Sequence, residues 1–451
     1  MCSFIFSTKE IKNIIEANLF SKNRGPDKTC EYLVNDKYHF VHNLLSITGD
    51  FKTQPFVKND IYCVFNGQIY NYKEFNQNYS SDGECLIDLY EKFGFEFIKK
   101  LDGEFAIVLL DLKKEILVIS SDVFGTKPIW IGKDKNNNLG VATYKSSLVS
   151  EGFEDIRQCP PNASFLINLK NNQMIKKDKV YQFDLNQHKE IFTDWINAFE
   201  NSISKRINSR EKIFIGLSSG YDSGAIACEL IKQSVDFNSF SIAAAEDVNI
   251  IYSRMEKIEK SMFIDLTEKE YNLQKLFLEK NSERYFSKPR KHRPRGYLVT
   301  NDKGAVGTGI ICELAKNKGC KIYLSGQGSD EILSDYGHNG KMAQGFIHGD
   351  VAGYYPENLE DIFPWTNFFF GTQREFLYKD EAVGGTYGIE CRYPFLDKSV
   401  VQEFLWLKND LKNCYYKAPI REYLVKNDFP FNEGLKTKVG FRANNFRNKN
   451  N

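Results

Sequence analysis

The 451-residue sequence has almost no net charge and no long apolar run, and both absences exclude whole classes of protein. Its 60 lysines and arginines nearly balance its 59 aspartates and glutamates, which leaves a formal net charge of +1. A chain this close to neutrality has no global field to attract nucleic acid or an anionic membrane. No stretch of about 18 uncharged apolar residues occurs, so we expect no transmembrane helix. The first residues lack a basic segment followed by an apolar core, so we also predict no secretory signal.

Metal-binding and disulfide patterns are missing as well. The ten cysteines are scattered, no CxxC occurs, and only six histidines are present. This spacing supports neither a zinc site nor a disulfide framework. We therefore expect reduced thiols in a cytoplasmic protein. What is present is an ordinary globular composition, with 42% hydrophobic residues, in a chain long enough for two or three domains.

The pattern of the chain changes near its middle. Residues 1–182 contain short apolar, β-branched and aromatic runs separated by turn residues, with one amphipathic helix predicted over 81–101. This half is predicted to be an α+β sandwich. The polar stretch 182–190 forms the expected boundary between the two halves.

From residue 191 onward the sequence alternates strand, polar turn and helix. An amphipathic helix is predicted over 191–207, and two strand–turn–helix units follow at 211–233 and 320–336. Such units build parallel sheets, which bind ligands at the carboxyl ends of their strands. We therefore expect a doubly wound α/β domain, followed by C-terminal helices.

The opening stretch MCSFIF places a cysteine at position 2. If Met1 is removed, the Cys2 thiol and a free α-amino group stand on one residue. An α-amino group titrates near pH ~7.7–8.0, so it can act as a base at neutral pH. A nucleophile with its own base attached is the arrangement of N-terminal hydrolases. A chance cysteine on an edge strand is the alternative interpretation.

The turn after the first strand of the second half is rich in small residues. Ser218, Ser219 and Gly220 precede a helix that holds Asp222 and Ser223. Small residues let backbone N–H groups approach an anion at a helix N-terminus. Asp222 would repel a bare phosphate, so we expect a divalent cation between them. A helix cap without any ligand is the alternative interpretation.

A second turn of the same kind strengthens the prediction of a nucleotide site. Ser325, Gly326, Gly328 and Asp330 follow another predicted strand. Asp222 and Asp330 are therefore expected to share one Mg²⁺ on a pyrophosphate, because one or two carboxylates are the usual protein ligands of nucleotide-bound Mg²⁺.

Twelve segments, taken in order, identify a family. They are Cys2, RGPD (24–27), LLSI (44–47), FNGQIYN (65–71), SDGE (81–84), DGEFAIVLLD (102–111), DVFGTKP (122–128), LSSGYDS (217–223), FSI (240–242), LSGQGSDE (324–331), ECRYPFLD (390–397) and KVGF (438–441). Together they resemble the glutamine-dependent asparagine synthetases and the related β-lactam synthetases over nearly the whole chain. The resemblance implies an N-terminal nucleophile hydrolase-type class II glutamine amidotransferase domain over 2–182. It also implies an ATP-pyrophosphatase domain over 191–451.

The resemblance implies two coupled reactions. At the first site Cys2 attacks the side-chain amide of glutamine, and its own α-amino group handles the proton. The released ammonia reaches the second site, where ATP and Mg²⁺ convert a carboxylate to its acyl-adenylate and ammonia displaces AMP. With aspartate as acceptor, the products are asparagine, AMP, pyrophosphate and glutamate.

The resemblance also assigns individual residues to these two sites. The catalytic residues it implies are Cys2, Asn66, Gly67, Glu390 and Lys438, with Asn66 and Gly67 forming an oxyanion hole. The glutamine-binding residues it implies are Asn66, Gly67, Gln68 and Asp82. The ATP-binding residues it implies are Leu217, Ser218, Gly220, Asp222, Ser223, Ile242, Ser325 and Gly326, with Gln327 facing the acceptor and Asp222 and Asp330 holding the metal.

The sequence departs from the family pattern at three places. Leu44 stands where the family has an arginine that binds the glutamine α-carboxylate, a contact worth roughly 1.5–3 kcal/mol. Ser219 and Tyr221 replace a glycine and a leucine in the first loop. Gln327 replaces a glutamate near the reacting carboxyl group, and an amide cannot take a proton.

These departures leave some questions open. The acceptor is expected to be aspartate, but another carboxylic acid, such as a sugar acid or a secondary metabolite, is the alternative, and a degenerate binding protein without turnover is a third option. Residues 246–300 match the family poorly and include the basic stretch 288–295, which is either a solvated loop or a loop over the active site. A homodimer is one option for the oligomeric state.

Overall fold

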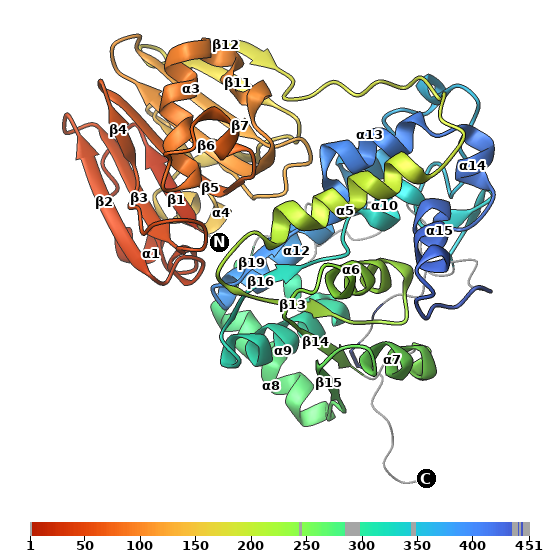
Figure 1. Cartoon of the computed structure of the whole chain (residues 1–451). Helices are drawn as coiled ribbons and strands as arrows, with labels where there is room; N and C mark the ends of the chain where they lie inside the picture. Colours follow the sequence, from red (N-terminus) through yellow and green to blue (C-terminus); the bar gives the residue numbers. More distant parts are fainter. Residues whose placement is uncertain are drawn as a thin grey trace. The chain divides into compact units, whose positions relative to one another are not determined.

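The structure is a computed structural model that describes the chain apart from a few short segments. The segments outside the described residues are Met1, 243–245, 285–297, 344–348, 435–440, 442 and 445–451. The chain forms two compact units, and we describe each by itself (Figure 1). The first unit consists of Met1–Gln182, Asn281–Leu298 and Gly384–Glu390. The second unit consists of Phe183–Lys280, Val299–Val383 and Cys391–Asn451.

The first unit is built on two six-stranded sheets. In spatial order the first sheet contains β10 (Glu154–Gln158), β8 (Trp130–Lys133), β9 (Leu139–Ala142), β1 (Ser3–Ser7), β3 (Tyr38–Leu44) and β2 (Lys28–Val34). The second contains β12 (Gln173–Asp178), β11 (Ser164–Asn168), β7 (Ile116–Ser121), β6 (Gly103–Asp111), β5 (Ile61–Ile69) and β4 (Phe56–Lys58). The prediction that short apolar runs of this half form strands is confirmed.

Apolar residues from both sheets form the core of this unit. Phe4, Phe6 and Phe40 on the first sheet pack in one cluster with Val108 and Ile119 on the second. Alternate residues of a strand point to opposite faces, which is why these positions can all meet between the sheets. The short helices of the unit are α1 (Ile14–Ala17), α2 (Tyr72–Phe75), α3 (Cys85–Phe93) and α4 (Lys145–Ser150).

The helix predicted over 81–101 is interrupted in the structure. The α-helix α3 ends at Phe93, and a 3-10 segment runs from Gly94 to Lys100. Gly94 has a φ of 58°, a left-handed conformation that glycine adopts without steric cost and that ends an α-helix. The apolar spacing therefore predicts the helical character of this segment correctly, but it does not predict the break at Gly94.

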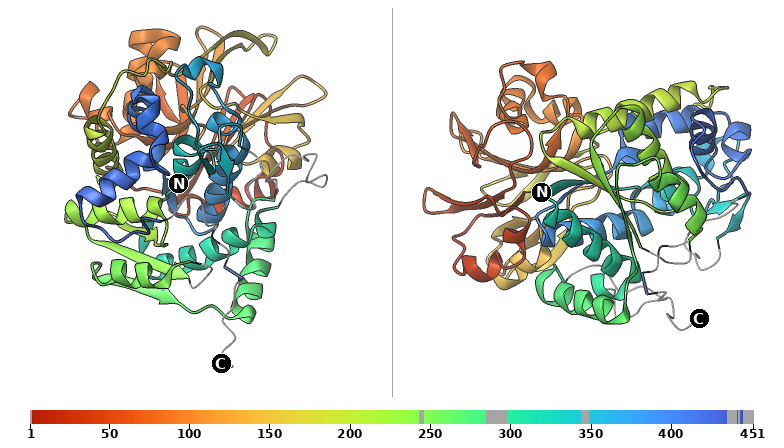
Figure 2. Two further views of the ribbon diagram at one scale, coloured as in Figure 1. Left: turned by 90° about the vertical axis from the view of Figure 1, so that its right-hand side faces the viewer. Right: turned by 60° about the horizontal axis from the view of Figure 1, so that its bottom comes forward.

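The second unit is built on a five-stranded sheet with helices on both faces (Figures 1 and 2). In spatial order the strands are β15 (Lys260–Ile264), β14 (Phe237–Ile242), β13 (Lys212–Gly216), β16 (Cys320–Leu324) and β19 (Glu390–Arg392). β13 pairs in parallel with both β14 and β16. Later strands thus extend the sheet on both sides of β13, as expected for a doubly wound fold.

The helices of the second unit follow the predicted order. They are α5 (Thr193–Ile207), α6 (Tyr221–Lys232), α7 (Val248–Met255), α8 (Glu268–Asn281), α9 (Lys303–Asn317), α10 (Ser329–Leu333), α11 (Thr366–Phe369), α12 (Gly371–Thr386), α13 (Lys398–Trp406), α14 (Asn409–Asn413) and α15 (Ala418–Lys426), with a small hairpin of β17 (Gly337–His338) and β18 (Lys341–Met342). In α5, Trp195, Phe199 and Ile203 recur every four residues and are buried, which explains why this segment forms an amphipathic helix. Among the described residues no helix is both long and apolar enough to span a bilayer.

The order of strands fixes where a ligand can bind in this unit. β13 and β16 are neighbours in the sheet. The strand next to β13 on its other side is β14, and the strand next to β16 on its other side is β19, so the sheet extends in opposite directions from this pair. Loops after two such strands diverge and leave a crevice at their carboxyl ends. Both small-residue turns that the sequence singled out, 217–220 and 325–328, lie at this place.

Candidate functional sites

Cys2 lies at the entrance to β1 and is largely buried. Its Sγ accepts a hydrogen bond from Leu45 N at 3.4 Å and lies 3.7 Å from Leu45 O. Burial, together with the nearby carboxylates of Glu390 and Asp82, raises the pKa of the thiol to about 11, against the opposing effects of the terminal ammonium and of the hydrogen bond with the Leu45 backbone. The thiol is therefore protonated at neutral pH, and it needs a base to become a nucleophile.

A pocket that is partly open to solvent lies beside this thiol. Besides Cys2, the residues that line it include Leu44, Gly67, Gln68 and Asp82, all of which the sequence singled out. Thr48 Oγ1 donates to Gln68 Oε1 at 2.6 Å, and Gln68 Nε2 donates to Asp82 Oδ2 at 2.8 Å. This chain of hydrogen bonds fixes the orientation of the Asp82 carboxylate at the pocket wall.

Asn66 carries an unusual feature of this region. Its carboxamide is fully buried, yet neither Nδ2 nor Oδ1 has a hydrogen-bond partner among the described residues. A buried polar group without a partner costs about 1–3 kcal/mol, so such groups are rare unless a ligand satisfies them. Gly67 follows with a φ of 135°, and a Cβ there would lie 1.9 Å from Glu104 O, so no other residue fits.

Glu390 lines this same pocket. The resemblance implies a catalytic role for Glu390, and that role stays a prediction. Glu390 is the first residue of β19, whereas Arg392, the last, accepts a hydrogen bond from Ser325 N at the carboxyl end of β16.

The loop after β13 is closed by hydrogen bonds among its own small residues. Ser218 N donates to Ser223 Oγ at 3.0 Å, and Gly220 N donates to Ser218 Oγ at 3.1 Å. Arg254 spans the loop from behind, with Nη1 donating to Ser218 O and to Gly220 O. The loop is thus a compact turn at the N-terminus of α6, where an anion is favoured.

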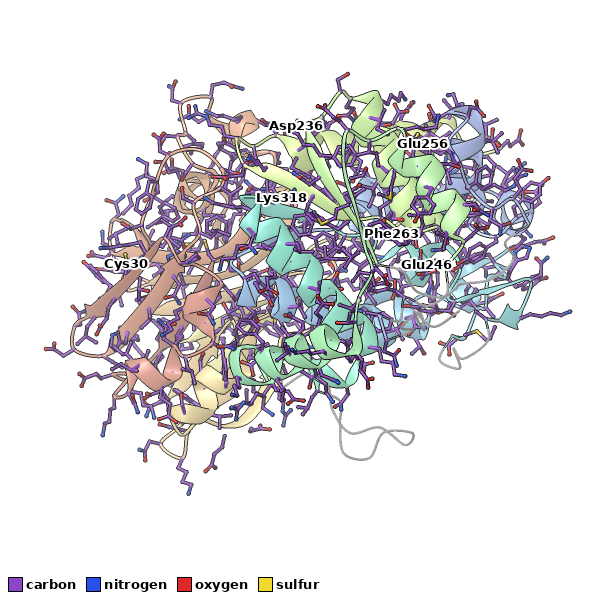
Figure 3. The ribbon with its side chains drawn as sticks, turned by 90° about the horizontal axis from the view of Figure 1, so that it is seen from below. Cys30, Asp236, Glu246, Glu256, Phe263 and Lys318 are labelled. Atoms are coloured by element: carbon purple, nitrogen blue, oxygen red, sulfur yellow. The ribbon has the colours of Figure 1, made fainter. Side chains whose placement is uncertain are left out.

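Glu246 occupies part of this turn, and no sequence signal pointed to it. Its Oε2 accepts a hydrogen bond from Ser219 N at 2.7 Å, and the neighbouring Asp247 N donates to Ser219 Oγ at 3.2 Å. Glu246 lies just before α7, and Glu256 lies just after it (Figure 3). A carboxylate therefore takes one of the loop N–H groups that a phosphate would use.

Removing the negative charge of Glu246 is expected to tighten nucleotide binding. In Glu246→Gln, the charge-assisted hydrogen bond from Ser219 N becomes a neutral one. The side chain at position 246 then competes less strongly with a phosphate of ATP for this N–H group. We expect the ATP dissociation constant to fall about 5- to 10-fold in calorimetry. Glu256→Gln, at the other end of α7, is the control and should leave the constant unchanged. Weaker binding by Glu246→Gln would instead mean that the charge holds the loop in its binding form.

The ammonium group of a lysine lies between the two predicted metal ligands, Asp222 and Asp330. Lys417 Nζ lies 2.6 Å from Asp222 Oδ1 and 2.6 Å from Asp330 Oδ1, and the lysine is buried. Ser329 Oγ also donates to Asp222 Oδ1 at 2.6 Å. The two carboxylates raise the pKa of Lys417 above its ordinary value despite the opposing effect of burial. The two aspartates therefore lie on either side of an ammonium group that the sequence did not reveal, and their binding of one Mg²⁺ stays a prediction.

Asp222 and Asp330 fit a Mg²⁺ ion only if the phosphates of a nucleotide supply further ligands. Among the described residues no group of three or more histidine, cysteine, aspartate or glutamate side chains could hold a metal alone. Two carboxylates suffice for Mg²⁺ when nucleotide phosphates complete the coordination. The donor set therefore fits a metal that arrives with its nucleotide.

The loop after β16 brings Ser325 beside a second buried acid. Ser325 Oγ donates to Asp380 Oδ2 at 2.7 Å, and burial raises the pKa of Asp380 to about 6. Gln327 is half-buried, and its N–H donates to Ser325 Oγ at 3.3 Å. A Cβ on Gly326 would lie 3.0 Å from Asp222 Cβ, so the two loops touch at the crevice.

Two remaining predictions concern positions outside or behind this crevice. Tyr221 is buried, and its hydroxyl donates to Asn432 O at 3.0 Å, so its ring packs under the loop instead of facing the crevice. Ile242 is the last residue of β14, and Leu217 directly follows β13. Lys438 and the basic stretch 288–295 lie outside the described residues.

Two family models match the chain in the order of its two halves. A model described as glutamine amidotransferase domain matches residues 1–183. A model described as asparagine synthase matches residues 194–350.

Three curated relatives have names that include asparagine synthetase. A Methanocaldococcus jannaschii protein named "Putative asparagine synthetase (glutamine-hydrolyzing) 1" is 27% identical over 80% of this chain and 68% of its own length. The human and mouse asparagine synthetases (glutamine-hydrolyzing) are 26% and 25% identical, each over 90% of this chain and 76% of their own length.

A solved structure of the glutamine phosphoribosylpyrophosphate amidotransferase of B. subtilis is also similar, with 14% identity over 58% of this chain and 81% of that protein, at a TM-score of 0.34. The fold therefore rests on the elements described above, and the family rests on the matched models and the relatives. The chain belongs to the asparagine synthetase family, as an enzyme of the glutamine-hydrolysing asparagine synthase type.

Proposed function

We propose that this enzyme uses glutamine and ATP to amidate aspartate, through an aspartyl-adenylate, with release of asparagine, AMP, pyrophosphate and glutamate. The observation that carries the proposal is that one chain holds both a buried cysteine that lines a pocket with Gly67 and Asp82 and a small-residue crevice at the ends of β13 and β16. The first suits amide hydrolysis, and the second suits nucleotide binding.

The first reaction is assigned to residues 2–182, which we propose as the glutaminase domain. After removal of Met1, the Cys2 thiol loses its proton to its own α-amino group and attacks the amide carbonyl carbon of glutamine. The Asn66 Nδ2 and the Gly67 N–H stabilise the oxyanion that forms. Ammonia leaves, and water hydrolyses the thioester to glutamate. Asp82 binds the substrate α-amino group, an ionic contact that its fixed orientation supports.

The second reaction is assigned to residues 191–451, which we propose as the synthetase domain. The loop formed by Ser218, Gly220 and Ser223 binds the phosphates of ATP, and Ser325 and Gly326 form the facing wall of the crevice. The acceptor carboxylate attacks the α-phosphate, and AMP becomes a leaving group that a bare carboxylate lacks. Asp222 and Asp330 would hold Mg²⁺, which when bound offsets the negative charge of the leaving pyrophosphate.

We propose the cytoplasm as the location of the enzyme, because all ten of its cysteines are unpaired thiols. We also propose that ammonia formed at the first site reaches the second without release. A stimulation of glutamine hydrolysis by ATP and acceptor would support such coupling.

Amidation of a different carboxylic acid is the second candidate function, and Gln327 is the observation that favours it. Gln327 is half-buried and its backbone N–H donates to Ser325 Oγ, and we propose that its side chain faces the acceptor. An assay of amide formation with aspartate and a panel of small carboxylic acids distinguishes the two candidates. Turnover of another acid, but not of aspartate, would overturn the proposed acceptor.

Replacing Gln327 by glutamate also tests which carboxylic acid is the acceptor. If aspartate is the acceptor, Gln327→Glu is expected to preserve or raise kcat/KM for aspartate, because glutamine there serves only to orient the acceptor. If another acid is the true acceptor, the added charge should lower kcat/KM for that acid more than about tenfold, since a misplaced buried charge costs several kcal/mol. A change below about twofold for every acid would show that residue 327 does not face the substrate.

A further inference from the structure

The pocket beside Cys2 lacks the arginine that would bind the α-carboxylate of glutamine. Leu44 stands at that position, is 6% exposed and lines the pocket. The pocket wall otherwise carries the carboxylates of Asp50, Asp82 and Glu390. A second negative charge from the substrate would be repelled by these groups unless a cation lies close to it.

Arg24 is the nearest alternative arginine by sequence, but its guanidinium is already committed. Its side chain is 0% exposed, with Nε donating to Cys2 O at 3.1 Å and Nη1 donating to Tyr144 OH at 3.0 Å. Its guanidinium also lies 5.1 Å from the centre of the Tyr144 ring. Arg24 therefore holds the backbone of the nucleophile and is not among the residues that line the pocket.

Lys52 is the one cationic side chain among the described residues that line the pocket. Its side chain is 41% exposed, and Nζ lies 3.1 Å from Glu84 Oε1. Glu84 does not depend on this contact, because Ser80 N donates to its Oε2 at 2.7 Å and Ser81 N donates to the same oxygen at 3.3 Å. An ammonium group has three donors, so Lys52 can keep Glu84 and still bind a second carboxylate.

We infer that Lys52 binds the α-carboxylate of the amide donor, in the role that an arginine at position 44 would otherwise have. The inference rests on the proposed function, because it takes glutamine to be the donor. Lysine is a point charge without the bidentate geometry of arginine. Because Lys52 is also partly exposed, the KM for glutamine should rise with ionic strength, as screening weakens exposed contacts.

The test compares two amides that differ only in the carboxylate. Glutamine carries it, and 4-aminobutanamide lacks it but keeps the amine and the amide. We expect Lys52→Met to lower kcat/KM for glutamine about 10- to 100-fold, chiefly through KM, and to leave hydrolysis of 4-aminobutanamide unchanged. The double variant Lys52→Met with Leu44→Arg should regain most of the activity on glutamine, because a cation returns to the pocket.

Lys58→Met is the matched control. Lys58 is similarly exposed at 48% and pairs with Asp88 at 2.7 Å, but it does not line the pocket. It should leave both amides unaffected. Equal loss on both amides in Lys52→Met, no loss on either, or equal use of the two amides by the wild-type enzyme would overturn the inference. If the wild-type enzyme and Cys2→Ala hydrolyse each amide at the same rate, the proposed function fails instead. This result is distinct from all the others.

Discussion

Replacing Cys2 by alanine is expected to abolish glutamine-dependent synthesis and to spare synthesis from added ammonium. Removal of a catalytic nucleophile lowers turnover by more than about 10⁴-fold. Ammonium bypasses the first reaction, so the second reaction should stay within about twofold of the wild-type rate. The measurement is asparagine formation with each nitrogen source at saturating ATP and aspartate.

Cys30→Ala provides the control for this variant. Cys30 lies on β2, is partly exposed and has no proposed role, so both activities should persist. Equal loss of both activities in Cys2→Ala would contradict the assignment of two separate sites. Full glutamine-dependent activity in Cys2→Ala would remove the cysteine from the mechanism altogether.

The pH dependence of glutamine hydrolysis tests which group takes the proton of Cys2. Burial raises the pKa of the thiol to about 11, so only a very small fraction is thiolate at neutral pH. If the α-amino group is the base, kcat/KM should rise as that group deprotonates near pH ~7.7–8.0 and then level off. A rate that keeps rising tenfold per pH unit up to pH 10 would show that the thiolate forms without this base.

The sequence predicted the places where loops follow strands better than it predicted distant contacts. Ser218 and Ser325 were placed at strand ends because a run of apolar residues stops just before each of them. Such boundaries depend on neighbouring residues, so a few positions of sequence are enough to show both the end of the strand and the small residues that follow it. The meeting of the two loops also followed, because neighbouring parallel strands end at the same edge.

Glu246 and Lys417 could not be found in the same way. Lys417 contacts an aspartate 195 positions earlier, and it has a φ of 46° at the entrance to α15. Nothing in the neighbouring residues distinguishes it from other lysines of the chain. Glu390 shows the converse difficulty, because its motif was recognised but its position at the start of a three-residue strand was not.

Replacing Lys417 by methionine is expected to give the largest loss of stability among these variants. Lys417 Nζ lies 2.6 Å from one carboxylate oxygen of Asp222 and of Asp330, and its removal leaves two buried carboxylates without their shared cation. Breaking such a buried pair costs about 3–5 kcal/mol, which corresponds to a fall in Tm of roughly 6–20 °C for a domain of this size. Thermal unfolding at pH 7 measures it.

The change of stability with pH identifies the cause. The folded-state pKa of Lys417 is raised, so its contribution is fully present below its unfolded value of about 10.4 and is lost as pH rises through the folded value. The gap in stability between the wild-type protein and Lys417→Met should therefore be constant at neutral pH and narrow only in strong alkali. Lys412→Met is the control. Lys412 is equally buried, but its Nζ donates a hydrogen bond to the carbonyl oxygen of Leu405 and not to a carboxylate. Burial lowers the pKa of Lys412 to about 6.

A double variant separates the charge of Lys417 from its packing. Adding Asp222→Asn to Lys417→Met removes one of the two uncompensated carboxylates, so more than half of the lost stability should return, as expected for coupled neighbours. ATP–pyrophosphate exchange should nevertheless stay depressed at least about 100-fold in the double variant, because Asp222 is also proposed to hold the metal on the pyrophosphate. No recovery of Tm would mean that the lysine stabilises the site by packing alone. Recovery of exchange together with Tm, in a variant that lacks both side chains, would show that neither Asp222 nor Lys417 is needed for the chemistry of the synthetase site.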